Sequence, residues 1–263
     1  VCGQPESQSS VRAFSDGNEG IYIFWLDSRS GVSRSVYGQH YDAAGYSQWE
    51  ADGRLIVSHS NLISSFTVAG YENGDIIIGW LTKSVAASLP DTLLLQKLGT
   101  EGEKLWPEDL VAATSTEPEP YDIAHLNSFG FAPVNDMYAV FIRAGYGFGF
   151  QGNRYSYFNS NGVMEGVVNG WPIGPQSDFG SSGFMATTDG SGDVILYYST
   201  GNGMGAALGV VRAGEGGSVA WGPVYATEGS SGLNYGFTAS IDEGGAIFIW
   251  QGSGSNGSVD LFA

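Results

Sequence analysis

The chain has 263 residues, and 27 acidic against 10 basic side chains give it a net charge of −17. A field of that sign repels nucleic acid and anionic membrane surfaces, and no apolar run approaches the roughly 18 residues that cross a bilayer. A lone cysteine, Cys2, excludes an internal disulfide framework and a cysteine-based metal site. We therefore expect no nucleic-acid partner and no membrane insertion.

Short apolar strands separated by turns rich in Gly, Asn and Asp repeat along the chain, and helical periodicity is almost absent. In each repeat an inner strand that contains Phe precedes a polar hairpin turn, and the second strand that follows ends on an aromatic residue. These aromatic residues are Trp25, Trp80, Phe141, Tyr198 and Trp250. A step of about 50 to 60 residues is typical of a β-propeller, in which each repeat is one four-stranded blade.

The repeat predicts a single all-β domain over residues 1–263, a five-bladed β-propeller of four-stranded antiparallel blades. Its units cover approximately residues 11–58, 63–114, 124–174, 181–227 and 234–263, the last completed by residues 1–4. The fifth unit has no outer strand of its own. We therefore expect the N-terminal strand to complete the last blade and close the ring, which removes two exposed sheet edges. The alternative is a fragment cut within a longer repeat array.

Two of the units share a pattern of matching residues. The first contains Trp25, Asp27, Arg29, Gln39, Gly45 and Trp49, and the second repeats part of it as Trp80, Gln96, Gly102 and Trp106. This pattern resembles the propeller-like repeat regions of Bacteroidota proteins that the type IX secretion system exports. The resemblance covers most of the chain, and in that family a Val-Cys pair such as Val1-Cys2 often ends a repeat. It implies a secreted or cell-surface protein, part of something longer, with a structural pattern that carries no catalytic residue.

Signals for catalysis are weak in this sequence. A five-bladed glycosidase needs two carboxylates at the mouth of the channel, and the five expected inner strands contain no Asp or Glu. A sialidase needs an arginine cluster, for which these strands offer only Arg12. His40, His59 and His125 are isolated, and no Gly-x-Ser-x-Gly elbow accompanies them. We therefore predict that the protein is not an enzyme and needs no cofactor.

Asp- and Gly-rich turns recur in every unit, and hairpin geometry explains them, so we predict no metal site. Calcium bound by Asp189 and Asp193 is the less favoured alternative. The segment from Asp42 to Trp49 resembles the Asp-box of sialidase-type propellers with a longer spacing, and we interpret it as a strand-connecting turn with a packed Trp. Thr92 lies in an Asp-Thr-Leu pattern that Bacteroidota use for O-glycosylation, which makes it a candidate glycosylation site.

Binding through the loop face is the function that the sequence favours. In a propeller, the loops between second and third strands share one face with the loops between blades. The third unit expands such a loop and alternates Gly with aromatic residues, which exposes apolar rings that a ligand would cover. The candidate ligand-binding residues are Tyr146, Phe148, Phe150, Arg29, Arg34 and His125.

The sequence thus predicts a non-catalytic extracellular β-propeller module, secreted or on the cell surface, that binds a glycan or another surface protein. One alternative is a structural module whose open blade pairs with a neighbouring chain or with a neighbouring domain of a larger protein. The other is a glycoside hydrolase-like five-bladed propeller, which requires two carboxylates converging at one end of the channel.

Overall fold

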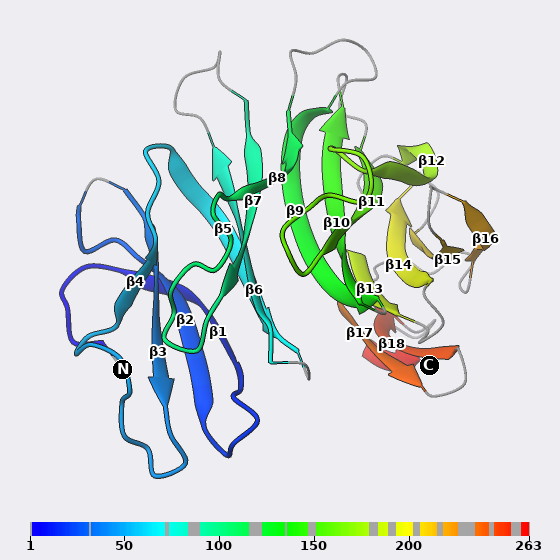
Figure 1. Ribbon diagram of the computed structural model, residues 1–263. Coiled ribbons are helices and arrows are strands. Elements are labelled where there is room, and N and C mark those ends of the chain that lie inside the picture. Colours follow the sequence, from blue (N-terminus) through cyan, green and yellow to red (C-terminus); the bar gives the residue numbers. More distant parts are fainter. Residues whose placement is uncertain are drawn as a thin grey trace. The chain divides into compact units, whose positions relative to one another are not determined.

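The computed structural model of the chain is built from antiparallel β-sheets (Figure 1). It describes residues 2–31, 33–71, 74–83, 90–115, 123–134, 136–146, 151–178, 184–188, 193–201, 206–214, 218–225, 235–241, 245–253 and 259–262. Within them there is no helix, and hence none long and apolar enough to cross a membrane. The all-β prediction is confirmed. Two compact units divide the chain: Val1–Thr114 with Ser160–Val163, and Ser115–Asn159 with Met164–Ala263.

Two four-stranded sheets form the first unit. One has the strand order β1 (Gln8–Ser15), β2 (Ile21–Asp27), β3 (Ser35–Tyr41) and β4 (Arg54–Val57). The other has the order β5 (Leu62–Gly70), β6 (Ile76–Lys83), β7 (Thr92–Leu98) and β8 (Leu110–Thr114). Each strand pairs antiparallel with the next in sequence, and the first strands of the two sheets, β1 and β5, contact each other. This is the arrangement expected of consecutive blades that begin with their inner strand.

The second unit continues the same order. Its first two sheets consist of β9 (Ile123–Val134), β10 (Met137–Tyr146), β11 (Gln151–Asn159) and β12 (Trp171–Asp178), then β13 (Phe184–Thr188), β14 (Val194–Gly201), β15 (Ala206–Ala213) and β16 (Val219–Tyr225). Its third sheet consists of β17 (Tyr235–Ile241), β18 (Gly245–Ser253) and β19 (Val259–Phe262). β13 contacts both β9 and β17, so the first strands of these three sheets lie side by side.

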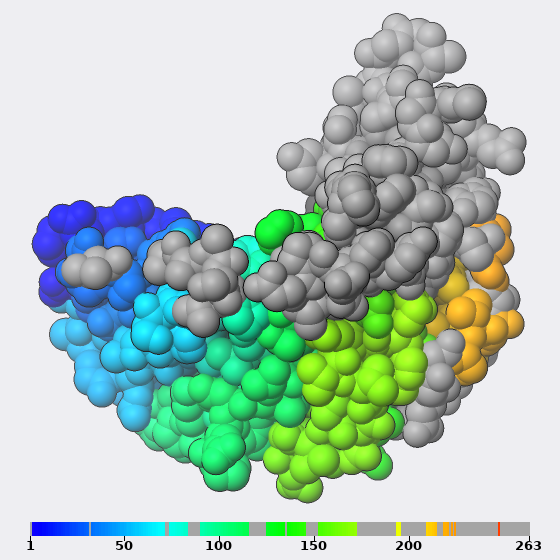
Figure 2. Space-filling view, turned by 90° about the horizontal axis from the view of Figure 1, so that it is seen from above, coloured from blue at the N-terminus to red at the C-terminus, as the bar shows by residue number. Residues whose placement is uncertain are grey.

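The two sheets of the first unit pack face to face around an aromatic core, and Figure 2 shows the first sheet (blue) directly against the second (cyan). Tyr22 and Phe24 of β2 belong to this core, where Ile78 and Trp80 of β6 meet them from the second sheet. Because side chains alternate across a strand, Trp25 lies on the opposite face of the first sheet. Trp80, fully buried, thus packs one repeat against the preceding one.

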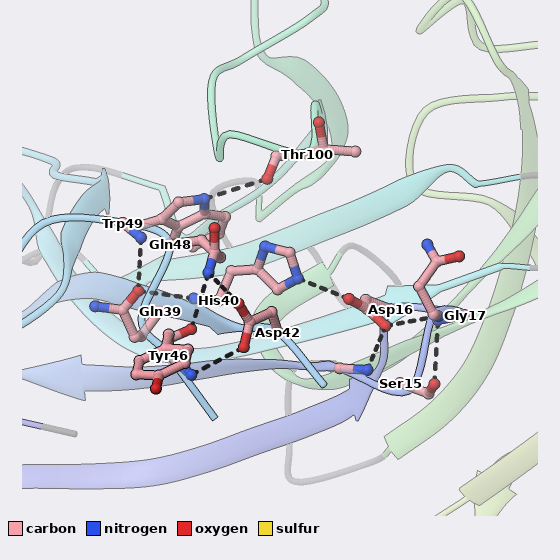
Figure 3. A network of polar contacts seen from close by, with 12 residues as sticks. Ser15, Asp16, Gly17, Gln39, His40, Asp42, Tyr46, Gln48, Trp49 and Thr100 are labelled. Atoms are coloured by element: carbon pink, nitrogen blue, oxygen red, sulfur yellow. Dashed lines mark hydrogen bonds and ion pairs between the residues drawn. The ribbon is translucent and has the colours of Figure 1, made fainter. Parts of the chain in front are cut away.

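A tryptophan in the turn after β3 joins the first repeat to the second (Figure 3). Trp49 Nε1 donates to the backbone oxygen of Thr100 at 3.2 Å, and its backbone N–H donates to Gln39 Oε1 at 3.0 Å. Asp42 closes the turn, because its Oδ1 accepts from the backbone N–H of Tyr46 at 2.9 Å. The interpretation of this segment as a strand-connecting turn with a packed Trp is confirmed.

The second repeat makes the same connection with Trp106. Its Nε1 donates to the backbone oxygen of Ser160 at 2.9 Å, and its backbone N–H donates to Gln96 Oε1 at 2.9 Å. Gly162 lies against the indole with φ +76°, and a Cβ there would lie 2.5 Å from the ring. In the third repeat Gly166 occupies the tryptophan position, and the ring of Trp171 fills the space beside it.

The third repeat is out of phase with the alignment made on Phe141. Equivalent bridges close the turns after the third strands, Leu98↔Lys104 in the second repeat and Phe158↔Met164 in the third. Leu98 and Phe158 are therefore equivalent positions. Four residues before each of them, Leu94 pairs with Trp80 and Arg154 pairs with Ile142, so the residue equivalent to Trp80 is Ile142. Phe141 therefore lies on the other face of its sheet, in a core shared with Val194 and Val211 of the next sheet. The aromatic step is thus regular in sequence and shifted by one residue in structure.

The sequence predicts that the N-terminal segment completes the last blade. Residues 2–7 form no strand, and the described strands of the last sheet number three. Asp52 holds the segment on the first sheet instead, because its Oδ1 accepts from the backbone N–H of Gly3 and its Oδ2 from Gln4 Nε2, both at 2.8 Å. The expected pairing of the N-terminal strand with the last blade is therefore not confirmed.

Arg29 links the loop after β2 to other parts of its own sheet through hydrogen bonds. Its Nη2 donates to Asp27 Oδ2 at 2.7 Å and to the backbone oxygen of Asp52 at 2.8 Å. Its guanidinium lies 3.8 Å from the centre of the Tyr37 ring. The buried Asp27 carboxylate also accepts a hydrogen bond from Trp25 Nε1 at 2.9 Å. Burial acts to raise the pKa of Asp27, but the hydrogen bonds from Arg29 and Trp25 outweigh it and hold the pKa at about 2.

The connection between repeats is tested by Trp106→Phe, which keeps an aromatic ring and removes the indole N–H. We expect the free energy of unfolding, measured by urea denaturation followed by circular dichroism, to fall by about 1–2 kcal/mol. Leu105→Ala is the control, because Leu105 is 49% exposed and adjacent in sequence. An unfolding free energy of Trp106→Phe equal to that of the control would contradict the structural role of this hydrogen bond.

The Asp27 carboxylate makes stability depend on pH in the acid range. Its pKa is lower in the folded chain than the ordinary 3.8, so its contribution is complete above that value and is lost as the pH falls toward about 2. We expect Asp27→Asn to lower the free energy of unfolding by about 2 kcal/mol at neutral pH. The variant should also lose less stability than the wild type between pH of about 4 and 2. Urea titrations across this range measure both effects, and parallel pH curves would refute the assignment.

Candidate functional site

The predicted ligand-binding residues belong to both compact units. Phe148 and Phe150 lie outside the described residues, and Tyr146 ends β10, where its backbone pairs with Ile123. Arg34 is partly buried just before β3. Arg29 holds a loop and a carboxylate of its own sheet, so it is a structural cation.

The predicted modification and metal residues occupy structural positions. Thr92 begins β7 and is flanked by Thr82 on β6 and Thr114 on β8. For the calcium alternative, Asp189 lies outside the described residues and Asp193 Oδ2 accepts from Arg212 Nε at 2.9 Å. No group of three or more His, Cys, Asp or Glu side chains suited to a metal ion occurs in the described part of the chain.

His125 lies within a sheet, in a row of strand pairs. It is exposed near the start of β9 and pairs across the sheet with Gly145 of β10. Gly145 pairs with Gln151 of β11, which pairs with Asp178 of β12. The backbones of these four residues therefore form one row across the end of this sheet.

A second polar row lies next to the first. Arg143 pairs with Ser128 on one side and with Asn153 on the other. Residues two apart on a strand share a face, and directly opposite residues do too, so Arg143 lies on the face that carries Gly145 and His125. Arg143 is half-buried, and burial lowers the pKa of its guanidinium, which stays charged. A partly desolvated cation attracts an anion more strongly than one in water.

β9 carries a β-bulge near its start, between His125 and Ser128. Asn127 has no partner in the ladder, because Leu126 pairs with Ala144 and Ser128 with the next residue back, Arg143. Bulges of this kind are frequent next to active sites, where they redirect a side chain. A Cβ added to Gly145 would meet Asn127 Nδ2 at 3.5 Å and His125 Cβ at 3.7 Å.

The face therefore combines the imidazole of His125, the guanidinium of Arg143 and a position without a side chain at Gly145. Imidazole exchanges a proton near neutral pH, which suits it to general acid or base catalysis. Asp178 is the one carboxylic acid within the four strands β9–β12, so these strands do not supply the pair of carboxylates that a glycosidase uses.

No protein-family model matches the chain, and no curated protein does. Its fold is nevertheless found among solved structures. A PL25 ulvan lyase, a polysaccharide lyase solved bound to -[GlcA(1-4)Rha3S]-, superposes with a TM-score of 0.59 at 14% identity, over 97% of this chain and 64% of the lyase. A protein of unknown function from Dyadobacter fermentans superposes with a TM-score of 0.60 at 12% identity, over 99% of this chain and 80% of that protein.

A puromycin hydrolase mutant gives a TM-score of 0.53 at 11% identity, over 97% of this chain and 35% of that enzyme. The chain thus spans less than two thirds of the length of the ulvan lyase and about a third of the hydrolase. Identities this low establish a shared fold and leave activity to be argued from the site.

The prediction of a non-catalytic binding module that is not an enzyme is wrong in its main reading. The fold is shared with a polysaccharide lyase, which favours the glycan-cleaving alternative over the binding module. Carboxylates on inner strands and a Gly-x-Ser-x-Gly elbow are signatures of hydrolases, and their absence from the sequence does not exclude other enzymes of this fold. A glycan partner stays compatible with this fold, and the surface-protein partner gains no support. The chain thus has a β-propeller-like all-β fold, which it shares with a polysaccharide lyase.

Proposed function

We propose that the chain is the catalytic domain of a polysaccharide-cleaving enzyme that acts outside the cell or at its surface. The observation that carries this proposal is the placement of exposed His125 and half-buried Arg143 on one face of sheet β9–β12, beside the side-chain-free Gly145. The fold shared with a polysaccharide lyase supports it, and the location rests on the repeat resemblance.

The reaction that these two side chains support best is β-elimination at an acidic sugar. Arg143 would bind the uronate carboxylate and stabilise the negative charge that develops beside it. His125 would take the C5 proton, the C4–O bond would break, and a C4=C5 double bond would form. The imidazolium formed on His125 would return the proton to the departing glycosidic oxygen, so the step needs no other reactant.

The overall charge of the chain acts against an anionic substrate. A net charge of −17 repels a polyanion over distances comparable to the screening length. Attraction must then come from the local Arg143 contact. At low ionic strength, added salt should therefore lower KM, because it screens the repulsion between the chain and the polyanion. For an enzyme with a basic surface, added salt would raise KM.

A second candidate, hydrolysis, is favoured by one observation. Asp178 lies in the same cross-strand row as His125, with Gly145 and Gln151 between them. The product distinguishes the two reactions, because elimination leaves an unsaturated sugar that absorbs ultraviolet light and hydrolysis leaves a saturated one.

We expect His125→Ala to lower kcat on a uronate-containing polysaccharide by about 10²–10⁴-fold, because the proton acceptor is lost. Arg143→Gln should lower kcat/KM strongly as well. The matched control is His59→Ala, which removes a histidine from the other unit. Ultraviolet absorbance of the product follows each reaction. Full activity in His125→Ala would reject this residue as the base.

We also propose that the five sheets close into one ring, as the repeat predicts. The Trp25 face of the first sheet supports this proposal, since Val11 is 59% and Leu55 48% exposed there, beside an apolar cavity of about 290 Å³. In the second sheet Trp80, on the equivalent face, is fully buried. A closed ring predicts a compact monomer by small-angle X-ray scattering and one cooperative unfolding transition. An elongated particle or two transitions would contradict it.

A further inference from the structure

Arg143 and Asn153 occupy a position of the repeat that is otherwise apolar. They face each other across β10 and β11. Counted from the turns after the third strands, the equivalent pairs are Leu26 with Val36 in the first repeat and Leu81 with Leu93 in the second. Each of these four side chains is at most 1% exposed. The third repeat therefore places a cation and an amide where its two predecessors have core residues.

Asn153 is buried with an unused acceptor. The residue is 6% exposed, and its Oδ1 has no hydrogen-bond partner. Buried amides elsewhere on the third strands are different: Gln39 Oε1 accepts from the backbone N–H of His40 and of Trp49. Gln96 repeats both bonds in the second repeat. A buried acceptor without a donor costs free energy that an apolar side chain would not. A donor from a bound molecule would satisfy it.

The spacing of the pair fits one sugar ring. Directly opposite residues on a sheet have Cβ atoms about 4.5–5.5 Å apart. An anionic group at Arg143 and a hydrogen-bond donor at Asn153 must therefore come from the same small molecule or the same unit of a polymer. A uronic acid carries both, a carboxylate and ring hydroxyls, whereas a neutral sugar lacks the first.

We propose that Arg143 and Asn153 form the subsite that binds the acidic sugar of the substrate, an inference that rests on the proposed function. Arg143 binds the carboxylate, and Asn153 Oδ1 accepts a hydrogen bond from a hydroxyl of the same sugar. Asn153 thereby orients the ring so that its reacting carbon faces the row that contains His125. Discrimination for acidic over neutral sugars comes from this pair.

Binding is measured apart from catalysis on the His125→Ala background, by calorimetric titration with a glucuronate-containing oligosaccharide and with a neutral oligosaccharide of equal length. We expect Asn153→Leu to weaken binding of the acidic probe roughly tenfold, the loss of one hydrogen bond. Its thermal midpoint should stay equal or rise, because leucine is the residue that the second repeat packs there. Asn153→Asp should weaken binding further, since it places a like charge beside the sugar carboxylate.

The matched control is Leu93→Asn, which introduces the amide at the equivalent position of the second repeat. It should lower the thermal midpoint and leave binding unchanged. Affinity of Asn153→Leu equal to the parent, a lowered midpoint in that variant, or no binding of the acidic probe by the parent chain would each overturn the subsite. Full activity of His125→Ala together with impaired binding in Asn153→Leu would reject the proposed base and leave the subsite standing.

Discussion

The first unit depends on one interaction, the hydrogen bond from the indole N–H of a turn tryptophan to a backbone oxygen of the following repeat. Trp49 makes it to Thr100 and Trp106 makes it to Ser160. A buried glutamine on each third strand holds the tryptophan backbone, so the ring is oriented by its own sheet before the next one packs against it. Because the acceptor is a backbone oxygen, the contact requires a turn of defined geometry and tolerates wide variation in the side chains around it.

The third repeat lacks two features that stabilise the first and second repeats, the connecting tryptophan and the buried apolar pair. Gly166 lies at the position of the connecting tryptophan, and Arg143 and Asn153 replace the buried apolar pairs of the first two repeats. Polar groups of this kind weaken a core, and proteins retain them where a ligand uses them. The candidate site therefore lies in the sheet that has departed from the repeat. In a protein built of similar blades, the loss of stability caused by the polar groups of a functional site can be limited to one blade, while the other blades keep apolar cores.

One residue of phase explains why the sequence concealed this departure. If Phe141 is aligned with Trp25 and Trp80, Arg143 becomes the equivalent of Asp27. A polar residue at this position is then expected, because the first repeat has one there too. The strand register aligns Ile142 with Trp80 instead, which moves Arg143 to a core position. Sequence periodicity could not decide between these alignments, because both faces of a blade are apolar when blades pack on both sides. The hydrogen-bonded register decides it directly.

The sequence by itself determined the all-β class, the order of the repeats, the hairpin pairing within them and the packed turn at Trp49, because alternation and turn chemistry are properties of neighbouring residues. Tertiary structure decided the rest. Asp52 draws the N-terminal segment onto the first sheet through contacts almost fifty residues apart in sequence. His125, Arg143 and Asn153 lie on three strands and share a face only through their register. A site assembled across strands has no local signature, since the residues that form it become neighbours only when the ladder fixes which rows they occupy.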